Sequence, residues 1–208
     1  MSAPGSIEDI YPLSPMQQGI LVHCLKAPGS GLYTLQMSWR LTGELDRPAF
    51  RSALARVVER HSVLRTSFVW EELDQPVQVV ESTVPLPLGE EDWSGLDEAA
   101  RRDRWQAFLA DDLARGFDLS RAPLTRLLLA QEGPACHRLV WLTHMLLVDG
   151  WSMSELIGDL FVHYEACRER RDPLLPSPRR YRDYIAWLLE QDQGEAERHW
   201  RREIGRAS

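Results

Sequence analysis

The sequence predicts an α/β fold with a mixed central sheet flanked by helices. Segments with apolar residues at helical spacing alternate along the chain with short segments rich in β-branched and aromatic residues. Two of the strand-like segments, 123–131 and 137–146, are almost continuously apolar, which is typical of central strands covered on both faces. The 208 residues, 44% of them hydrophobic, suffice for one large domain or two small ones. If the strands pair mostly antiparallel, the class becomes α+β.

In the first half of the chain, residues 1–6 are expected to form a flexible lead before an alternation of helices and strands. Ser14 and Asp46 are typical helix N-caps, and Pro15 occupies the first helical position that proline favours. The predicted helices span 14–26, 46–61 and 95–117, and the predicted strands span 32–41, 64–72 and 75–81, the last two as a hairpin.

In the second half, the two apolar strands are separated by a turn at Gly133–Pro134. A helix is expected over 149–170, with Ser152 or Ser154 as its cap. A Pro-rich loop follows at 172–180, and the chain ends in helices over 181–193 and 194–206.

The composition argues against several classes of protein. The formal net charge is −7, from 24 Lys and Arg against 31 Asp and Glu, whereas a nucleic-acid binder needs a basic face. Three widely spaced cysteines without a CxxC pair favour neither a disulfide framework nor a cysteine zinc site, and suit a reducing cytoplasm. No signal peptide is evident, and no apolar run approaches the roughly 20 residues that span a bilayer. We expect a soluble cytoplasmic protein with no membrane contact.

The segment "WLTHMLLVDGWSMSEL" (141–156) is the strongest candidate for a site, because a buried strand runs there through a loop into a helix. Asp149 could cap that helix, accept backbone N–H bonds or pair with an arginine. A lone His144 among apolar neighbours is more often a hydrogen-bonded core residue than a base. No serine-hydrolase elbow, phosphate-binding glycine loop or HExxH is present.

Several segments match, in order, the motifs of one family. "THMLLVDGWS" fits HHxxxDGxS through His144, Asp149, Gly150 and Ser152, with Met145 in place of the second histidine. The other matching segments are "YPLSPMQQGILVH" (11–23), "RHSVLRTSF" (60–68, against RHxxLRTxF), "FDLSRAPLTR" (117–126), "YRDYIAWLLEQ" (181–191) and "AERHWRREI" (196–204). The whole chain thereby resembles the N-terminal lobe of nonribosomal peptide synthetase condensation domains, in the chloramphenicol acetyltransferase-like superfamily.

The resemblance implies roles for individual residues. Met145 occupies the position of the histidine that handles the acceptor amine or its proton, and His144 is mainly structural. Asp149 is expected to form an ion pair with Arg60 or Arg65, and Gly150 to let backbone pass close to the substrate tunnel.

The resemblance also implies partners. Residues 7–208 would be the N-terminal lobe, with the second lobe absent from this chain, so a separate lobe or a second copy is an expected partner. Carrier proteins would present aminoacyl or peptidyl thioesters on phosphopantetheine arms, and neither a bound cofactor nor a metal is expected.

Three functions follow from these expectations. The first is amide formation, impaired or lost because a thioether neither donates nor accepts a proton at neutral pH. The second is a non-catalytic module that docks carrier proteins, with "RERRDPLLPSPRR" (168–180) as the basic stretch for an acidic partner. The third is one half of a split condensation enzyme.

Overall fold

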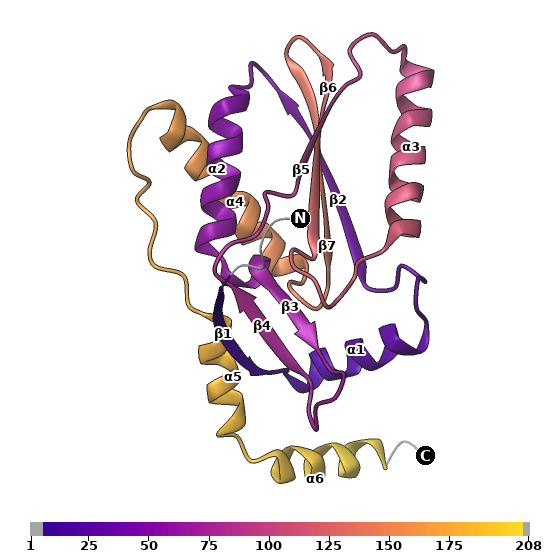
Figure 1. Ribbon diagram of the computed structural model, residues 1–208, viewed down its shortest axis with the longest axis vertical. Helices are drawn as coiled ribbons and strands as arrows, with labels where there is room; N and C mark the ends of the chain where they lie inside the picture. Colours follow the sequence, from indigo (N-terminus) through magenta and orange to yellow (C-terminus); the bar gives the residue numbers. More distant parts are fainter. Residues whose placement is uncertain (1–5, 206–208) are drawn as a thin grey trace.

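A computed structural model describes residues 6–205, which form two sheets with helices around them (Figure 1). The larger sheet has the strand order β2-β7-β6-β5 and is mixed, because β5 and β6 run parallel while the other neighbours are antiparallel. Its strands are β2 (Thr34–Thr42), β5 (Leu88–Asp92), β6 (Thr125–Gly133) and β7 (Cys136–His144). The two apolar segments are the central strands, as predicted.

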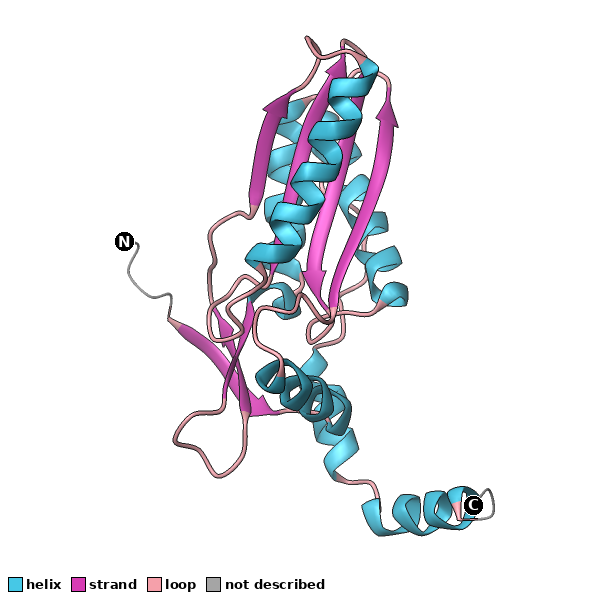
Figure 2. Cartoon of the chain, turned by 90° about the vertical axis from the view of Figure 1, so that its right-hand side faces the viewer, coloured by secondary structure: helices cyan, strands magenta, loops and turns pink. Residues whose placement is uncertain are grey.

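Successive residues of β7 face opposite sides of the sheet. Leu139 and Trp141 belong to the main core, which includes residues of α2 (Arg47–Arg60) and α4 (Gly150–Arg168). Val140 and Leu142 pack instead against α3 (Glu98–Arg115) on the other face. The helices therefore cover both faces, with α2 and α4 on one side of the sheet and α3 on the other (Figures 1 and 2).

The helix starts follow the predicted capping residues, with one exception. Ser14 and Gln17 form a reciprocal capping box at α1 (Pro15–Lys26), and Asp46 caps α2. The cap of α4 is Asp149, one of the roles predicted for that residue, and not Ser152 or Ser154, which lie inside the helix. The carboxylate of Asp149 reaches the Ser152 N–H from outside the helix, which is the geometry of an N-cap.

The smaller sheet has the order β1-β4-β3 and is antiparallel throughout. β3 (Thr66–Val69) and β4 (Val77–Glu81) form the predicted hairpin, preceded by a short 3-10 helix, η1 (Ser62–Arg65). Neither β1 (Ile7–Pro12) nor β5 was predicted. β1 shows no clean apolar alternation, and β5 is the acidic stretch "LGEED", so each depends on its strand partner rather than on local preference.

The ends of the chain complete the fold. The expected lead over 1–6 lies outside the described residues except for Ser6, which hydrogen-bonds Ser82. The loop 172–180 has no regular structure, as predicted, and leads into α5 (Tyr181–Leu189). α6 (Gln193–Ile204) extends away from the body of the protein (Figures 1 and 2).

Two further features concern the fold class and the membrane. Four of the five strand pairs in residues 6–205 are antiparallel, so the α+β alternative describes the pairing while the sheet with helices on both faces matches the α/β prediction. Within the same residues, no helix is long and apolar enough to cross a bilayer.

Arg65 ties the smaller sheet to the end of α2. Its guanidinium donates to Glu8 Oε2 at 2.6 Å, to the carbonyl of Glu81, and to the carbonyls of Val58 and Glu59 at 3.1 and 3.2 Å. Arg65 is only 6% exposed, so its guanidinium must be satisfied by these protein acceptors rather than by water. One side chain thus holds β1, β4 and α2 together.

We predict that Arg65→Met lowers the free energy of unfolding by about 3 kcal/mol, because it leaves several carbonyls and one carboxylate without their donor. Chemical denaturation of the chain measures the change. Arg104→Met is the matched control, since Arg104 pairs with Glu91 at the surface, and its loss should cost less than about 1 kcal/mol. Equal effects of the two substitutions would contradict the assignment.

Candidate functional site

The loop between β7 and α4 borders a cavity of about 620 Å³. The walls of this cavity come from α1, the junction of α2 and η1, the loop itself, the first turns of α4, and residues 178–184. Met145 and Asp149, two of the predicted site residues, line it together with Arg60. The structure therefore gathers residues from four motif segments of the sequence around one space.

Buried hydrogen bonds fix the course of the loop. The side chain of Gln17 donates to the carbonyl of Leu146 at 2.9 Å and is itself held by Ser14 and by Gln78, at 2.9 and 3.2 Å. The N–H of Met145 donates to the carbonyl of Tyr33 at 2.8 Å. Gln17 was not predicted as a site residue, although it lies within the matched segment 11–23, because its target carbonyl is 129 positions away.

Met145 presents its thioether to the cavity. Its side chain is 41% exposed, whereas the three residues that follow are buried. A thioether sulfur is at most a weak acceptor and carries no proton to exchange. At this position the chain can offer contact to a substrate but no proton transfer.

His144, unlike Met145, is buried inside the protein. Its ring is 3% exposed, its Nδ1 accepts the N–H of Leu146 at 3.2 Å, and its edge meets Phe117. Since Nδ1 is an acceptor, the neutral ring carries its proton on Nε2, which lies 3.6 Å from the sulfur of Cys24. Burial lowers the pKa of His144 to about 4, against a weaker opposing hydrogen bond with the backbone of Leu32. These are the surroundings of a neutral structural residue.

The expected ion pair between Asp149 and an arginine is not formed. Asp149 Oδ1 accepts both the N–H and the hydroxyl of Ser152, each at 2.8 Å, and the backbone bond is the main reason that the pKa of Asp149 is lowered. Arg60 pairs with Asp159 at 2.9 Å, and Arg65 pairs with Glu8 at 2.6 Å. Both guanidinium groups are thus held by other carboxylates, and Asp149 acts as a helix cap.

Gly150 is the first residue of α4. A Cβ added at Gly150 would meet no atom of the described residues within 4 Å, and its backbone is not in the left-handed region. Residues 6–205 therefore contain no contact that requires a glycine at this position.

A histidine and a carboxylate that were not predicted as site residues also meet at this cavity. Nε2 of His61, one of the lining residues, lies 2.7 Å from Oδ2 of Asp159, the oxygen that Arg60 also contacts. The matched segment 60–68 contains His61, but Asp159 is 98 positions further along the chain, and no local pattern connects the two.

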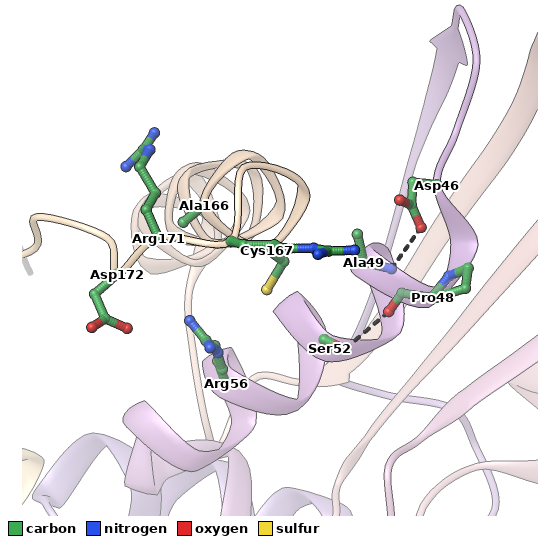
Figure 3. A pocket seen from close by; sticks show the side chains of 10 residues that line it. Asp46, Pro48, Ala49, Ser52, Arg56, Ala166, Cys167, Arg171 and Asp172 are labelled. Atoms are coloured by element: carbon green, nitrogen blue, oxygen red, sulfur yellow. Dashed lines mark hydrogen bonds between the residues drawn. The ribbon is translucent and has the colours of Figure 1, made fainter.

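Other features of the surface lie apart from this site. A cavity of about 540 Å³ between α2 and the end of α4 is lined by Arg56, Cys167 and Arg171 among others, and contains no predicted site residue (Figure 3). The arginines of the predicted basic stretch are exposed. Nowhere in residues 6–205 do three or more His, Cys, Asp or Glu side chains gather as a metal site would require.

Comparison with known sequences yields one family over nearly the whole chain. The family described as "Condensation domain" matches residues 7–207. A linear gramicidin synthase protein of Brevibacillus parabrevis is 42% identical over 205 residues, which make up 99% of this chain and 3% of that protein. A mycosubtilin synthase protein of Bacillus subtilis is 39% identical over 95% of this chain and 8% of its own length.

Solved structures agree on the fold. The starter condensation domain of rhizomide synthetase superposes with a TM-score of 0.84 at 20% identity, over 97% of this chain and 49% of that one. The first condensation domain of the calcium-dependent antibiotic synthetase, in complex with a substrate analogue, gives 0.75 at 22% identity over 82% and 40%. The likeness confirms the predicted fold, and the chain spans about half the length of the solved rhizomide synthetase domain.

We predict that the buried His144 makes the chain sensitive to acid. The unfolded chain takes up the proton near pH 6.5 and the folded chain only near pH 4, so stability is lost as pH falls through this window. The difference of about 2.5 pKa units corresponds to about 3 kcal/mol. Denaturation at several pH values should show this loss in the wild type. It should be absent in His144→Asn, whose amide oxygen can still accept the Leu146 N–H, and parallel curves for the two proteins would refute the assignment.

We predict that Gly150→Ala leaves the stability of this chain unchanged within about 0.5 kcal/mol, because the added methyl group meets open space at the first position of α4. Gly31→Ala is the matched control. Gly31 has a φ of +67°, and its Cβ would lie 2.6 Å from Leu113, so this substitution should be clearly destabilising. Thermal unfolding of both variants distinguishes the two cases.

Proposed function

We propose, since this chain belongs to the Condensation domain family, that residues 7–208 form the N-terminal lobe of a domain that joins carrier-bound aminoacyl or peptidyl thioesters through amide bonds. The related gramicidin and mycosubtilin proteins are peptide synthases, and the chain covers only a small part of each. We further propose that the amide-forming step is slowed or abolished in this lobe.

The place of Met145 carries the second proposal. It directly follows β7, it faces the 620 Å³ cavity, and the neighbouring His144 points into the core, where its Nδ1 is already bonded. Because the ring of His144 is buried and its Nδ1 already accepts the Leu146 N–H, His144 cannot serve the cavity in place of Met145. The position from which the family handles the proton therefore holds a group that cannot take one.

Amide formation includes a proton transfer that Met145 cannot assist. The amine of the acceptor attacks the thioester carbonyl, a C–N bond forms, the C–S bond breaks, and the nitrogen must give up a proton. A positioned base typically accelerates such a step by about 10²–10⁴-fold. Holding the two thioesters together remains possible without it, and proximity alone is worth about 7–11 kcal/mol in the best cases.

A second lobe is the partner that this chain requires under the proposal. The solved rhizomide synthetase domain has about twice its length, and α5 and α6 carry large apolar side chains that residues 6–205 leave exposed. Trp187, Trp200 and Ile204 are 54%, 61% and 66% exposed. An apolar surface of this kind favours association. The second lobe could follow in the same chain or come from a separate one, as in a split enzyme, and a second copy of this chain is the alternative.

Carrier proteins are the other proposed partners, and the phosphopantetheine thioester is their cargo rather than a cofactor of this chain. Arg179, which has no carboxylate partner among the described residues, and the partly paired Arg180 line the cavity. Their charge supports docking of an acidic carrier against the 168–180 stretch. A cytoplasmic location fits this substrate supply. A non-catalytic docking module would use the same surfaces, so amide formation decides between the two functions.

We predict that Met145→His raises the rate of amide formation by about 10²-fold or more when this lobe is joined to the second lobe of a relative. Loaded donor and acceptor carrier proteins supply the substrates, and product formation is followed with time. Met145→Leu is the matched control and should give no gain. The native two-lobed domain of the relative serves as the positive control.

Two results would contradict this proposal. If Met145→His gave no gain while the positive control was active, the residue at 145 would not limit the reaction. Fast turnover by the unaltered lobe, equal to that of the positive control, would show that the proton leaves by another route at full efficiency.

A further inference from the structure

His61 lines the cavity and contacts Asp159, and the proposed mechanism uses neither residue. His61 lies at the junction of α2 and η1, and its side chain is 16% exposed. Met145 approaches the same cavity from the end of β7. The two residues thus belong to different walls of one space.

The hydrogen bonds define which nitrogen is available. Nε2 of His61 lies 2.7 Å from Asp159 Oδ2, and a carboxylate accepts only, so Nε2 carries a proton. Nδ1 makes no hydrogen bond to any residue in the described range, and it retains contact with solvent, since it is not among the buried polar atoms without partners. In the neutral ring, Nδ1 therefore holds a free lone pair.

Asp159 is well placed to orient this ring. Its side chain projects from the middle of α4, is 18% exposed, and is also held by Arg60 Nε at 2.9 Å. Arg60 in turn donates to the carbonyl of Pro176 in the loop that borders the cavity. A base whose second nitrogen is anchored by a carboxylate is the arrangement that keeps an imidazole in one tautomer and one orientation.

We propose that His61, oriented by Asp159, accepts the proton of the acceptor amine in this domain and so supports the turnover that remains with Met145. The inference rests on the proposed function. As the amine nitrogen bonds to the thioester carbon, its proton passes to Nδ1 of His61, directly or through one water. The C–S bond breaks, and the departing thiolate takes a proton back, so the imidazole is regenerated.

His61 contacts Asp159, which Arg60 also contacts. The other charged groups that line the cavity are Asp149, Glu155, Arg179 and Arg180. A base must be neutral to act, so the proposed acceptor is the neutral ring of His61.

The test is amide formation by the two-lobed protein with Met145 in place. His61→Gln retains an amide donor toward Asp159, and it should lower kcat about 100-fold at unchanged KM. Asp159→Asn should also lower kcat at unchanged KM, because the imidazole loses the carboxylate that orients it. His199→Gln on α6, an exposed residue outside the cavity, should change neither. Thermal unfolding verifies that each variant is folded.

The double variant His61→Gln with Met145→His separates this inference from the proposed function. Recovery of turnover by the new imidazole supports both. If His61→Gln matches the wild type in rate, or if the wild type shows no turnover while Met145→His does, the role of His61 is wrong and the proposed function stands. If no variant turns over while the relative's native domain does, the proposed function fails as well.

Discussion

The register of β7 and the turn that follows it form the constraint on which the site depends. β7 is bonded on both sides, to β2 and to β6, so its register cannot slip by one residue without turning a core face outward. His144, the last residue of β7, is buried, and Met145, in the turn that follows, lines the cavity. The two positions that match the adjacent histidines of HHxxxDGxS therefore have different surroundings in this chain.

Buried hydrogen bonds connect the loop after β7 to the surrounding segments. Gln17 connects α1 to the loop after Met145, and Gln78 connects that same side chain to the smaller sheet. Arg65 then joins the smaller sheet to α2. Each of these side chains is at least 94% buried. A hydrogen bond in such surroundings is strong, and removing one partner would leave a buried polar group unpaired and destabilise the fold. The cavity walls are consequently held in place by a few long-range bonds rather than by the loop itself.

Local sequence signals were sufficient for most of the fold and for part of the site. Capping residues and hydrophobic periodicity located the helices from α1 to α6, and two apolar runs located the central strands. β1 and β5 were not predicted because β1 lacks a clean apolar alternation, β5 is acidic, and each takes its strand character from a partner distant in sequence. The partners of Arg60 and Arg65 were missed for the same reason. The arginines meet Asp159 and Glu8, 99 and 57 positions away, and no spacing rule reaches that far.

The surroundings of Met145 show that the residue at position 145 matters for the proposed chemistry and little for the stability of the fold. The backbone of Met145 is held by Tyr33, its side chain is 41% exposed, and the core residues begin with Leu146. A change of side chain at such a position removes little buried surface and breaks no internal hydrogen bond, so stability scarcely depends on it. Folding therefore does not require either histidine or methionine at position 145. What distinguishes them is the presence of a nitrogen lone pair at the cavity, and among the described residues His61, in another wall of the same space, offers an accessible one.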